Sequence, residues 1–250
     1  MISHQPLSPP KESSQPEDEP APPPAIGGVS FGDLWRLDPI GRQWGFDRGD
    51  PIDRLYIESF LDRHCEDVRG RVLEAGDNAY TRRFGGNRVV QSDVLHVDPE
   101  CKHATIIADL AAADHIPSDL FDCIILTQTL QLIFDVHGAV RTIERILKPG
   151  GTLLLTVPGI SQINLWENPS WSMTVNSVRL LLTERFPSES VSVESRGNVL
   201  AAIAFLQGLS QQDIGDFAFQ TDDPHYPLTV LARATKLMVA PALTPGNENL

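Results

Sequence analysis

Between residues 71 and 157, short apolar runs alternate with amphipathic stretches, and this alternation constrains the fold more than any other feature. We expect strands at 71–75, 91–97, 104–107, 122–127 and 151–157. The amphipathic stretches predict helices at 111–116, 137–147 and 174–186. Strands that alternate with helices in this way build a parallel sheet with helices on both faces.

The last third of the chain departs from the alternation. Residues 191–194 and 228–235 are typical of strands, and residues 198–209 are typical of a helix. Two late strands at one edge would complete a seven-stranded sheet.

The N-terminal region differs in composition from the rest. Residues 1–25 carry eight prolines among polar residues, which predicts a disordered tail, with partner docking in an extended polyproline conformation as the alternative. Residues 26–68 are expected to form a helical prelude or lid, in which Ile52, Tyr56 and Phe60 share one helical face. The main domain is expected over 69–238, followed by a C-terminal tail over 239–250.

Charge and cysteine content exclude several classes of function. The chain has 33 acidic and 20 basic residues, a net charge of -13, which argues against a nucleic-acid substrate. Arg82, Arg83 and Arg88 crowd together and are either a local basic groove or a solvated helix face. Three cysteines without a CxxC pair predict neither a disulfide framework nor a zinc site, so no metal is expected.

Location is predicted from what the sequence does not carry. The first residues lack the basic and apolar regions of a secretory signal, and the longest apolar run, 199–206, is much shorter than the roughly 20 residues of a membrane span. We therefore expect a cytoplasmic protein without membrane insertion. The oligomeric state is not predicted.

Acidic residues follow three of the predicted strands. The segment 71–77, RVLEAGD, ends a strand with Glu74, Ala75 and Gly76; Asp98 ends the next strand; and Asp109, followed by Leu110, ends the third. In an open parallel sheet ligands bind beyond the carboxyl ends of the strands, and an acid about 20 residues after the first strand is placed to bind a ribose. The alternatives remain open: Gly76 as a simple turn, and Asp98 and Asp109 as helix caps.

Two further motifs complete the pattern. Thr127 and Gln128 leave the strand FDCIIL at its carboxyl end, where polar side chains face the crevice. The segment 148–151, KPGG, ends a helix and turns the chain into the next strand, so its role is structural.

As an ordered set over residues 70–160, these motifs resemble the class I S-adenosylmethionine-dependent methyltransferases, in the group that includes the ubiquinone-biosynthesis enzymes. The resemblance implies an α/β fold: a Rossmann-like, doubly wound, seven-stranded sheet, mostly parallel with an antiparallel last strand. It also implies S-adenosylmethionine as the cofactor. By it, Glu74, Ala75 and Gly76 border the methionine moiety, Asp98 the ribose, Asp109 and Leu110 the adenine, and Thr127 and Gln128 the methionine moiety and the sulfonium.

A narrower resemblance concerns the methyl acceptor. The segments 44–54, WGFDRGDPIDR, and 80–86, YTRRFGG, are similar to bacterial methyltransferases associated with glycosyltransferases. This similarity implies a small-molecule or glycan acceptor, and O-methylation is the expected reaction.

The turn after Gly76 departs from the family pattern. The family has glycines at alternate positions, whereas this chain has Asp77, Asn78, Ala79 and Tyr80. The departure argues against a nicotinamide dehydrogenase, which needs glycines here for its pyrophosphate. It also leaves open a degenerate methyltransferase fold that binds no cofactor and acts as a structural or regulatory partner.

No catalytic base can be named from the sequence. His225 lies in a polar loop, His96 inside a strand, and His115 and His137 beside helices, and each has a plausible structural role.

Aromatic and charged residues could complete the site from outside the motifs. Trp44, Phe46, Arg48, Asp53 and Tyr56 are candidates for a lid, with Arg48 as a partner for the cofactor carboxylate; core packing and a surface ion pair are the alternatives. Trp166 and Trp171 are candidates either for an acceptor wall or for capping the core.

Overall fold

The computed structural model describes residues 23–163 and 168–238 and divides the chain into two units, 1–37 and 38–250. In the described part of the first unit, a 3-10 turn at Gly32–Leu34 is flanked by Phe31 and Trp35, whose ring centroids are 5.8 Å apart. The predicted tails, except for residues 23–25, lie outside the described residues. The proposed boundary at residues 68 and 69 stays a prediction.

The second unit is built on a seven-stranded sheet with the order β3-β2-β1-β4-β5-β7-β6. The strands are β1 Gly70–Ala75, β2 Val89–His96, β3 Ile106–Ile107, β4 Phe121–Thr127, β5 Leu147–Pro158, β6 Val191–Arg196 and β7 Thr229–Thr235. β1 to β5 pair in parallel, and β7 runs antiparallel to both β5 and β6. The predicted fold class, including the antiparallel last strand, is confirmed.

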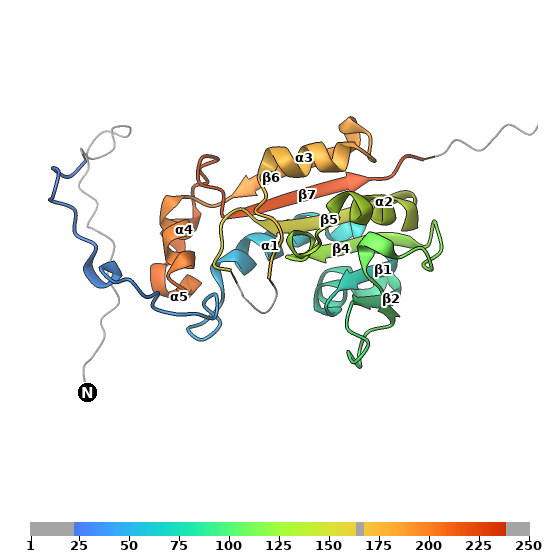
Figure 1. Cartoon of the computed structure of the whole chain (residues 1–250), viewed down its shortest axis with the longest axis horizontal. Helices are drawn as coiled ribbons and strands as arrows, with labels where there is room; N and C mark the ends of the chain where they lie inside the picture. Colours follow the sequence, from blue (N-terminus) through green and yellow to red (C-terminus); the bar gives the residue numbers. More distant parts are fainter. Residues whose placement is uncertain (1–22, 164–167, 239–250) are drawn as a thin grey trace, which may run out of the picture. The chain divides into compact units, whose positions relative to one another are not determined.

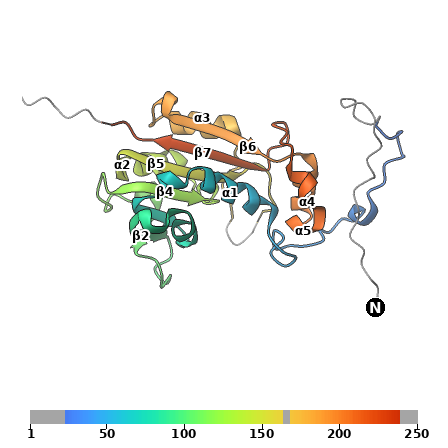
Figure 2. The same cartoon turned by 180° about the vertical axis from the view of Figure 1, so that it is seen from behind.

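Helices cover both faces of this sheet (Figures 1 and 2). They are α1 Ile52–Arg63, α2 Val136–Ile146, α3 Val175–Thr183, α4 Val199–Leu206 and α5 Gln211–Ile214. One core packs α2 and α3 against the sheet, with Ile143 and Leu182 fully buried. The other packs Ile57 and Leu61 of α1 against the opposite face. α4 and α5 lie beyond the carboxyl ends of the parallel strands, where Tyr56 of α1 joins the α4 cluster.

The predicted helix at 111–116 is wrong. The structure has a 3-10 turn at Leu110–Ala112, and the buried side chains in this segment are Leu110, Ala113 and Ile116. Their three-residue spacing suits 3-10 geometry, and Pro117 disfavours the α conformation at the residue before it. The strand expected at 104–107 is also shorter and contains only the two edge residues of β3.

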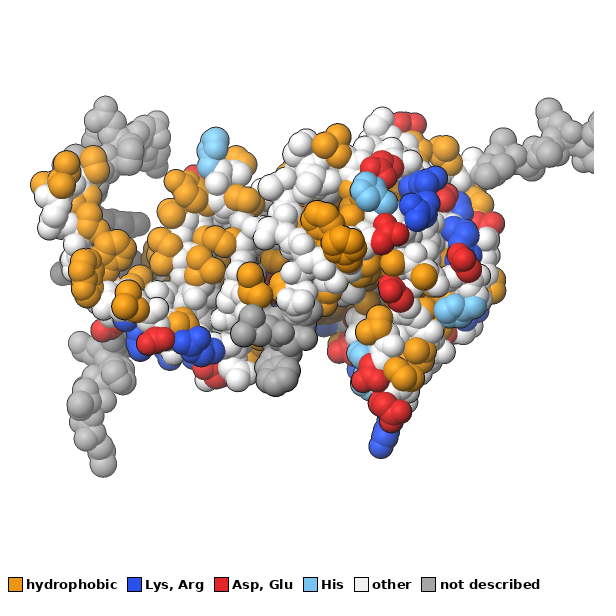
Figure 3. All heavy atoms as spheres, viewed as in Figure 1, with side chains coloured by type: hydrophobic (Ala, Val, Ile, Leu, Met, Phe, Trp, Pro, Cys, Tyr) orange, Lys and Arg blue, Asp and Glu red, His pale blue; other side chains and the backbone are white. Residues whose placement is uncertain are grey.

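Charged side chains on the surface are mixed in sign. On the face shown in Figure 3, basic groups around α2 lie among acidic ones. Of the arginines considered for a basic groove, Arg83 pairs with Glu58 at 2.8 Å and Arg88 with Glu66 at 3.6 Å. Among the helices of the described residues, none combines the length and the apolar character needed to cross a bilayer.

Candidate active site

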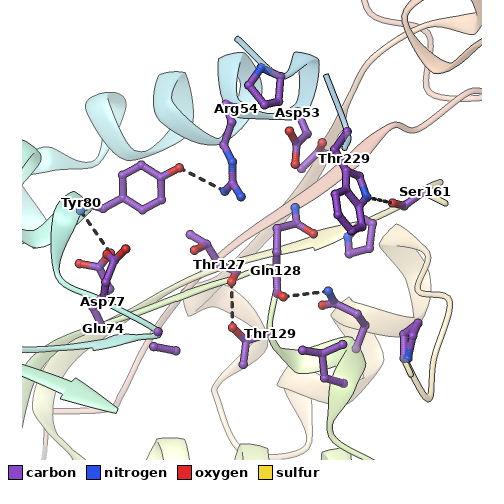
Figure 4. Close-up of a pocket in the computed structure, with 18 of the residues that line it drawn as sticks. Asp53, Arg54, Glu74, Asp77, Tyr80, Thr127, Gln128, Thr129, Ser161 and Thr229 are labelled. Atoms are coloured by element: carbon purple, nitrogen blue, oxygen red, sulfur yellow. Dashed lines mark hydrogen bonds between the residues drawn. The ribbon is translucent and has the colours of Figure 1, made fainter. Parts of the chain in front are cut away.

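The carboxyl ends of β1, β2, β4 and β5 open onto a cleft of about 2180 Å³. Its opposite wall is formed by α1, by Trp44, and by the start of β7 (Figure 4). Pockets for a single small ligand usually occupy about 300–1000 Å³. The cleft therefore has room for two ligands side by side.

Seven of the eight residues predicted to bind a cofactor line this cleft. They are Glu74, Ala75, Gly76, Asp109, Leu110, Thr127 and Gln128. Asp98 does not line it; its carboxylate is exposed and accepts the Glu100 N–H at 2.9 Å, while Val97 takes a place in the lining. The role of each of these residues in cofactor binding stays a prediction.

Glu74, the last residue but one of β1, has a buried carboxylate whose two oxygens both accept hydrogen bonds. One oxygen accepts the Tyr80 N–H at 3.2 Å, and the other accepts the Thr81 N–H at 2.7 Å. Burial raises the pKa of Glu74, while these two hydrogen bonds act in the opposite direction. The carboxylate therefore holds the start of the next turn, Thr81–Gly85, against the end of β1.

The chain between Gly76 and Tyr80 closes the turn without the family's glycines. Gly76 has φ of +90°, and a Cβ built on it would meet no atom within 4 Å, so the backbone here faces open space. Asp77 accepts the Ala79 N–H at 2.7 Å, and Asn78 donates to Ser92 at 3.2 Å. Hydrogen bonds from these polar side chains thus stabilise the turn in a chain that lacks the family's glycines.

Tyr80 stands at the side of the cleft and does not fill it (Figure 4). Its ring lies 5.9 Å from that of Phe84, and its hydroxyl accepts a hydrogen bond from Arg54 Nη1 at 3.2 Å. Burial raises the pKa of Tyr80, so the hydroxyl stays protonated. The side chain that replaces a small family residue therefore links the turn after β1 to α1.

The adenine side of the cleft combines one apolar and one acidic residue. Leu110 is buried, with Ala108 beside it in the lining. Asp109 is exposed, and its carboxylate accepts the Ala111 N–H at 2.9 Å as the cap of the 3-10 turn. Binding and capping were alternatives for Asp109 from the sequence; the geometry shows the cap, and the residue also lines the cleft.

Gln128 follows β4 with an unusual backbone. Its φ is +48°, rare for a residue with a side chain, and it is held there by a hydrogen bond from its N–H to the Thr156 carbonyl at 2.8 Å. Its own carbonyl accepts from Gln131 Nε2 at 2.9 Å. Such backbone positions cluster at ligand sites, because the surrounding structure fixes a side chain in a required direction. Here the amide points into the cleft (Figure 4).

The start of α1 contributes two side chains to the opposite wall. Asp53 and Arg54 both reach into the cleft opposite Thr127 and Gln128 (Figure 4). Arg48, the arginine expected to meet the cofactor carboxylate, instead forms a two-pronged ion pair with Asp213 at 2.7 and 2.9 Å and does not line the cleft. The sequence signal for Arg54 was its adjacency to Asp53 at a helix start, which did not distinguish it from Arg48.

Several buried polar atoms at the cleft have no hydrogen-bond partner among the described residues. They are Asp53 Oδ1, Gln128 Nε2, Gln131 Oε1 and Thr229 Oγ1. Buried polar groups are nearly always satisfied, and an unsatisfied one costs about 1–3 kcal/mol. Thr229 was not predicted as a site residue, because a threonine at the start of a strand carries no functional signal.

The aromatic candidates have different fates. Trp44 lines the cleft and donates to Ser161 Oγ at 3.2 Å, whereas Tyr56 packs away from the cleft, and burial raises its pKa to about 12. Trp171 stacks on Phe134 at 6.1 Å at the rim, where both are exposed. Trp166 lies outside the described residues.

The histidines add little to the site. His96 lines the cleft, whereas His225 and His115 do not, and His137 pairs with Glu184 at 2.8 Å on the surface. No group of three or more metal-ligating side chains is clustered for a metal ion within the described ranges.

Comparison with known proteins places this architecture in a family. A model of the methyltransferase domain matches residues 42–190. The ubiquinone/menaquinone biosynthesis C-methyltransferase UbiE of Pectobacterium carotovorum is 30% identical over 86 residues, which are 34% of this chain and 32% of that protein. UbiE of Pectobacterium atrosepticum is 30% identical over 98 residues, 38% of this chain and 37% of that protein. The chain thus aligns with about a third of the length of these curated relatives.

Solved structures share the fold at low identity. A SAM dependent methyltransferase from Archaeoglobus fulgidus has a TM-score of 0.50 at 12% identity, covering 73% of this chain and 94% of that one. The [4+2]-cyclase SpnF has a TM-score of 0.51 at 15% identity, covering 82% of this chain and 88% of that one. The family model spans more than half of the chain. The chain belongs to the methyltransferase-domain family, and it has the fold of the class I S-adenosylmethionine-dependent methyltransferases.

Proposed function

We propose that the chain transfers a methyl group from S-adenosylmethionine to a hydroxyl group of a small molecule or glycan. The observation that supports this most directly is the two-walled cleft: one wall holds the residues predicted for the cofactor, and the other presents polar atoms that await a partner. A cofactor bound by the strand ends and Arg54 would still leave the buried atoms of Asp53 and Thr229 on the second wall without a partner among the described residues.

The cofactor wall fits an adenosyl group. Gly76 leaves the backbone open to close approach, Leu110 offers an apolar surface for adenine, and Asp109 has a free oxygen beside it. Asp98 lies two residues beyond the lining residue His96, near enough in sequence to reach a ribose at the mouth. Glu74 and Ala75, with Thr127 and Gln128, border the position assigned to the methionine moiety.

Arg54 is the cation best placed for the carboxylate of the methionine moiety. Its guanidinium is half-buried, and its hydrogen bond within the described residues goes to the neutral Tyr80 hydroxyl. An arginine presents several donors in a fixed plane, which suits a carboxylate. Arg48 lacks this freedom because Asp213 already occupies it.

Methyl transfer depends mainly on how the protein positions the two reacting groups. The cofactor supplies a methyl group on a sulfonium, and the protein must hold the acceptor atom in line with the bond that breaks. Thr127 and Gln128 come from the end of a buried strand, so they are fixed in place.

The rim supports a glycan as one class of acceptor. Phe134 and Trp171 form an exposed stacked pair, and the Trp171 Nε1 donates to the carbonyls of Ile133 and Phe134 at 3.0 and 3.1 Å. A fixed aromatic surface at a cleft mouth can pack against the apolar face of a sugar ring. The relatives UbiE are named C-methyltransferases, so a carbon acceptor is the competing outcome.

Calorimetric titration with S-adenosylhomocysteine tests the cofactor half. We expect one site per chain, weakened about 30-fold by Arg54→Met, because a hydrogen-bonded charge pair is lost, and about fivefold by Asp98→Ala, whose carboxylate is exposed. Arg48→Met removes an arginine of the same region and should leave the affinity unchanged. If the titration of the wild-type protein gives no binding heat, the result would instead support a degenerate fold with a structural or regulatory role.

An acceptor screen tests the other half. Tritiated S-adenosylmethionine is incubated with nucleotide sugars, oligosaccharides and small phenols, and the methylated atom is located by mass spectrometry. Methylation of phenols alone would remove the glycan preference, and a new carbon–carbon bond would replace O-methylation with C-methylation.

A further inference from the structure

Three unpaired polar atoms meet on the acceptor side of the cleft, and they come from three distant parts of the chain. Asp53 Oδ1 is supplied by the first turn of α1, Gln128 Nε2 by the residue after β4, and Thr229 Oγ1 by the first residue of β7. In Figure 4 the Asp53, Thr229 and Gln128 side chains are directed into the same part of the cleft. Asp53 is 8% exposed and Thr229 is fully buried.

Packing alone does not account for this arrangement. A buried carboxylate oxygen without a hydrogen bond is costly, and an apolar side chain in its place would remove the cost. Each atom offers a complementary role toward a hydroxyl: the carboxylate accepts a hydrogen bond, the amide donates one, and the threonine hydroxyl does either. A ligand hydroxyl between them can donate to Asp53 and accept from Gln128 or Thr229, and its second lone pair then stays free to attack the methyl carbon.

We propose that Asp53 is the catalytic base that receives the proton of the acceptor hydroxyl, with Gln128 and Thr229 holding that hydroxyl in place. The acceptor oxygen bonds to the methyl carbon as the carbon–sulfur bond breaks, the electron pair of that bond stays on sulfur, and the proton passes to Asp53. The products are a methyl ether, a neutral thioether and a protonated carboxyl group. This assignment rests on the proposed function and specifies its acceptor as an alcohol or phenol.

The surroundings of Asp53 suit proton uptake. Burial raises its pKa, which is opposed by the positive charge of neighbouring Arg54 and by backbone N–H groups at the start of α1. Tyr80, on the turn after β1, is the other titratable group that senses Asp53. A carboxylate with a raised pKa is a stronger base than one in water, and general bases work best when their pKa approaches the working pH.

Asp53→Asn tests the assignment with three measurements on the full chain, with Asp47→Asn as the matched control. Asp47 is exposed in the segment before α1 and does not line the cleft. With tritiated S-adenosylmethionine and a panel of p-nitrophenyl glycosides and phenols, we expect kcat to fall about 100-fold in Asp53→Asn while KM for the acceptor changes little. The affinity for S-adenosylhomocysteine should stay within about twofold.

Thermal unfolding gives a readout that needs no acceptor. Because the pKa of Asp53 is raised in the folded state, its contribution to stability is full at low pH and is lost as the pH rises through that folded pKa. Asp53→Asn should therefore melt about 3 °C above the wild type near pH 8, with the two curves converging near pH 4.

The outcomes separate the alternatives. A destabilised Asp53→Asn makes the residue structural, and a large loss of S-adenosylhomocysteine affinity makes it a cofactor ligand; either overturns the assignment. An unchanged kcat, or a wild type that binds S-adenosylhomocysteine but methylates no hydroxyl in the panel, also overturns it. A wild type that binds no S-adenosylhomocysteine refutes the proposed function itself.

Discussion

The two walls of the cleft differ in how far their polar groups are satisfied. On the wall formed by the strand ends, Glu74 and Asp109 each accept backbone N–H groups from the turns that follow them. On the opposite wall, formed by α1 and the start of β7, Asp53 and Thr229 keep buried atoms without partners among the described residues, and so does Gln128, which follows β4 and faces them.

The difference separates two ways of building a binding site. The satisfied carboxylates stabilise the turns that shape the strand-end wall, so they serve the fold whether or not a ligand is bound. The unsatisfied atoms lower stability until a ligand binds, and a fold retains such groups where function needs them. Mutations of the satisfied and of the unpaired groups should therefore have opposite effects on stability.

The largest expected effect is a loss of stability at Glu74. Glu74→Gln replaces an oxygen that accepts the Tyr80 or Thr81 N–H with an amide that cannot accept it, and two donors then face each other in a buried site. We expect the free energy of unfolding to fall by about 2 kcal/mol, measured by urea denaturation.

Asp109→Asn is the matched control for this change. Its carboxylate is exposed and accepts a single N–H, from Ala111, so the loss should be about 0.5 kcal/mol or less. Equal losses at the two sites would mean that burial does not distinguish Glu74 from the other strand-end acid.

The satisfied wall was largely predictable from the sequence, and the reason is local. A strand, its terminal acid and the following turn are contiguous in the chain, so Glu74, Gly76 and Asp109 could be placed from spacing alone. The seven-stranded sheet with its antiparallel last strand, which the family resemblance implied, is confirmed. The prediction of an α-helix at 111–116 failed because the structure has a 3-10 turn there. Over so short a segment, the sequence does not distinguish the three-residue repeat of a 3-10 turn from the 3.6-residue repeat of an α-helix.

The unsatisfied wall could not be predicted in this way. Asp53 and Gln128 are 75 positions apart by their numbering, and Thr229 is a further 101 away. Only the crossing of α1 over the sheet and the return of β7 bring them together, and neither is encoded near the residues themselves. Arg54 and Arg48 show the same limit: both are arginines near one helix start, and an ion pair with Asp213 decides which one faces the cleft.

A smaller effect, on the affinity for S-adenosylhomocysteine, is expected from a substitution at Gly76. Gly76→Ala adds a Cβ that meets no protein atom, so any loss of binding reports a ligand in that space. We expect S-adenosylhomocysteine to bind about tenfold more weakly, equivalent to about 1.4 kcal/mol, measured by calorimetry.

Gly86→Ala controls for backbone strain in that experiment. Gly86 also has a positive φ, +53°, and open space at its Cβ, but it does not line the cleft. Both variants should lose about 1 kcal/mol of stability because alanine disfavours such backbone angles. A similar loss of affinity in the two would show that strain, and not contact with the cofactor, weakens binding.

The smallest effect has the opposite sign and concerns Gln128. Gln128→Leu replaces a buried, unpaired amide with an apolar group of similar size, so we expect a gain of about 0.5–1 kcal/mol in the free energy of unfolding. Gln131→Leu is the matched comparison, because Gln131 Nε2 donates to the Gln128 carbonyl at 2.9 Å and its removal should cost stability. Urea denaturation of both variants checks the sign. If Gln128→Leu were as destabilising as Gln131→Leu, the amide would be supporting the turn after β4, and the unpaired groups would not differ in stability from the satisfied ones in the way that their hydrogen bonds indicate.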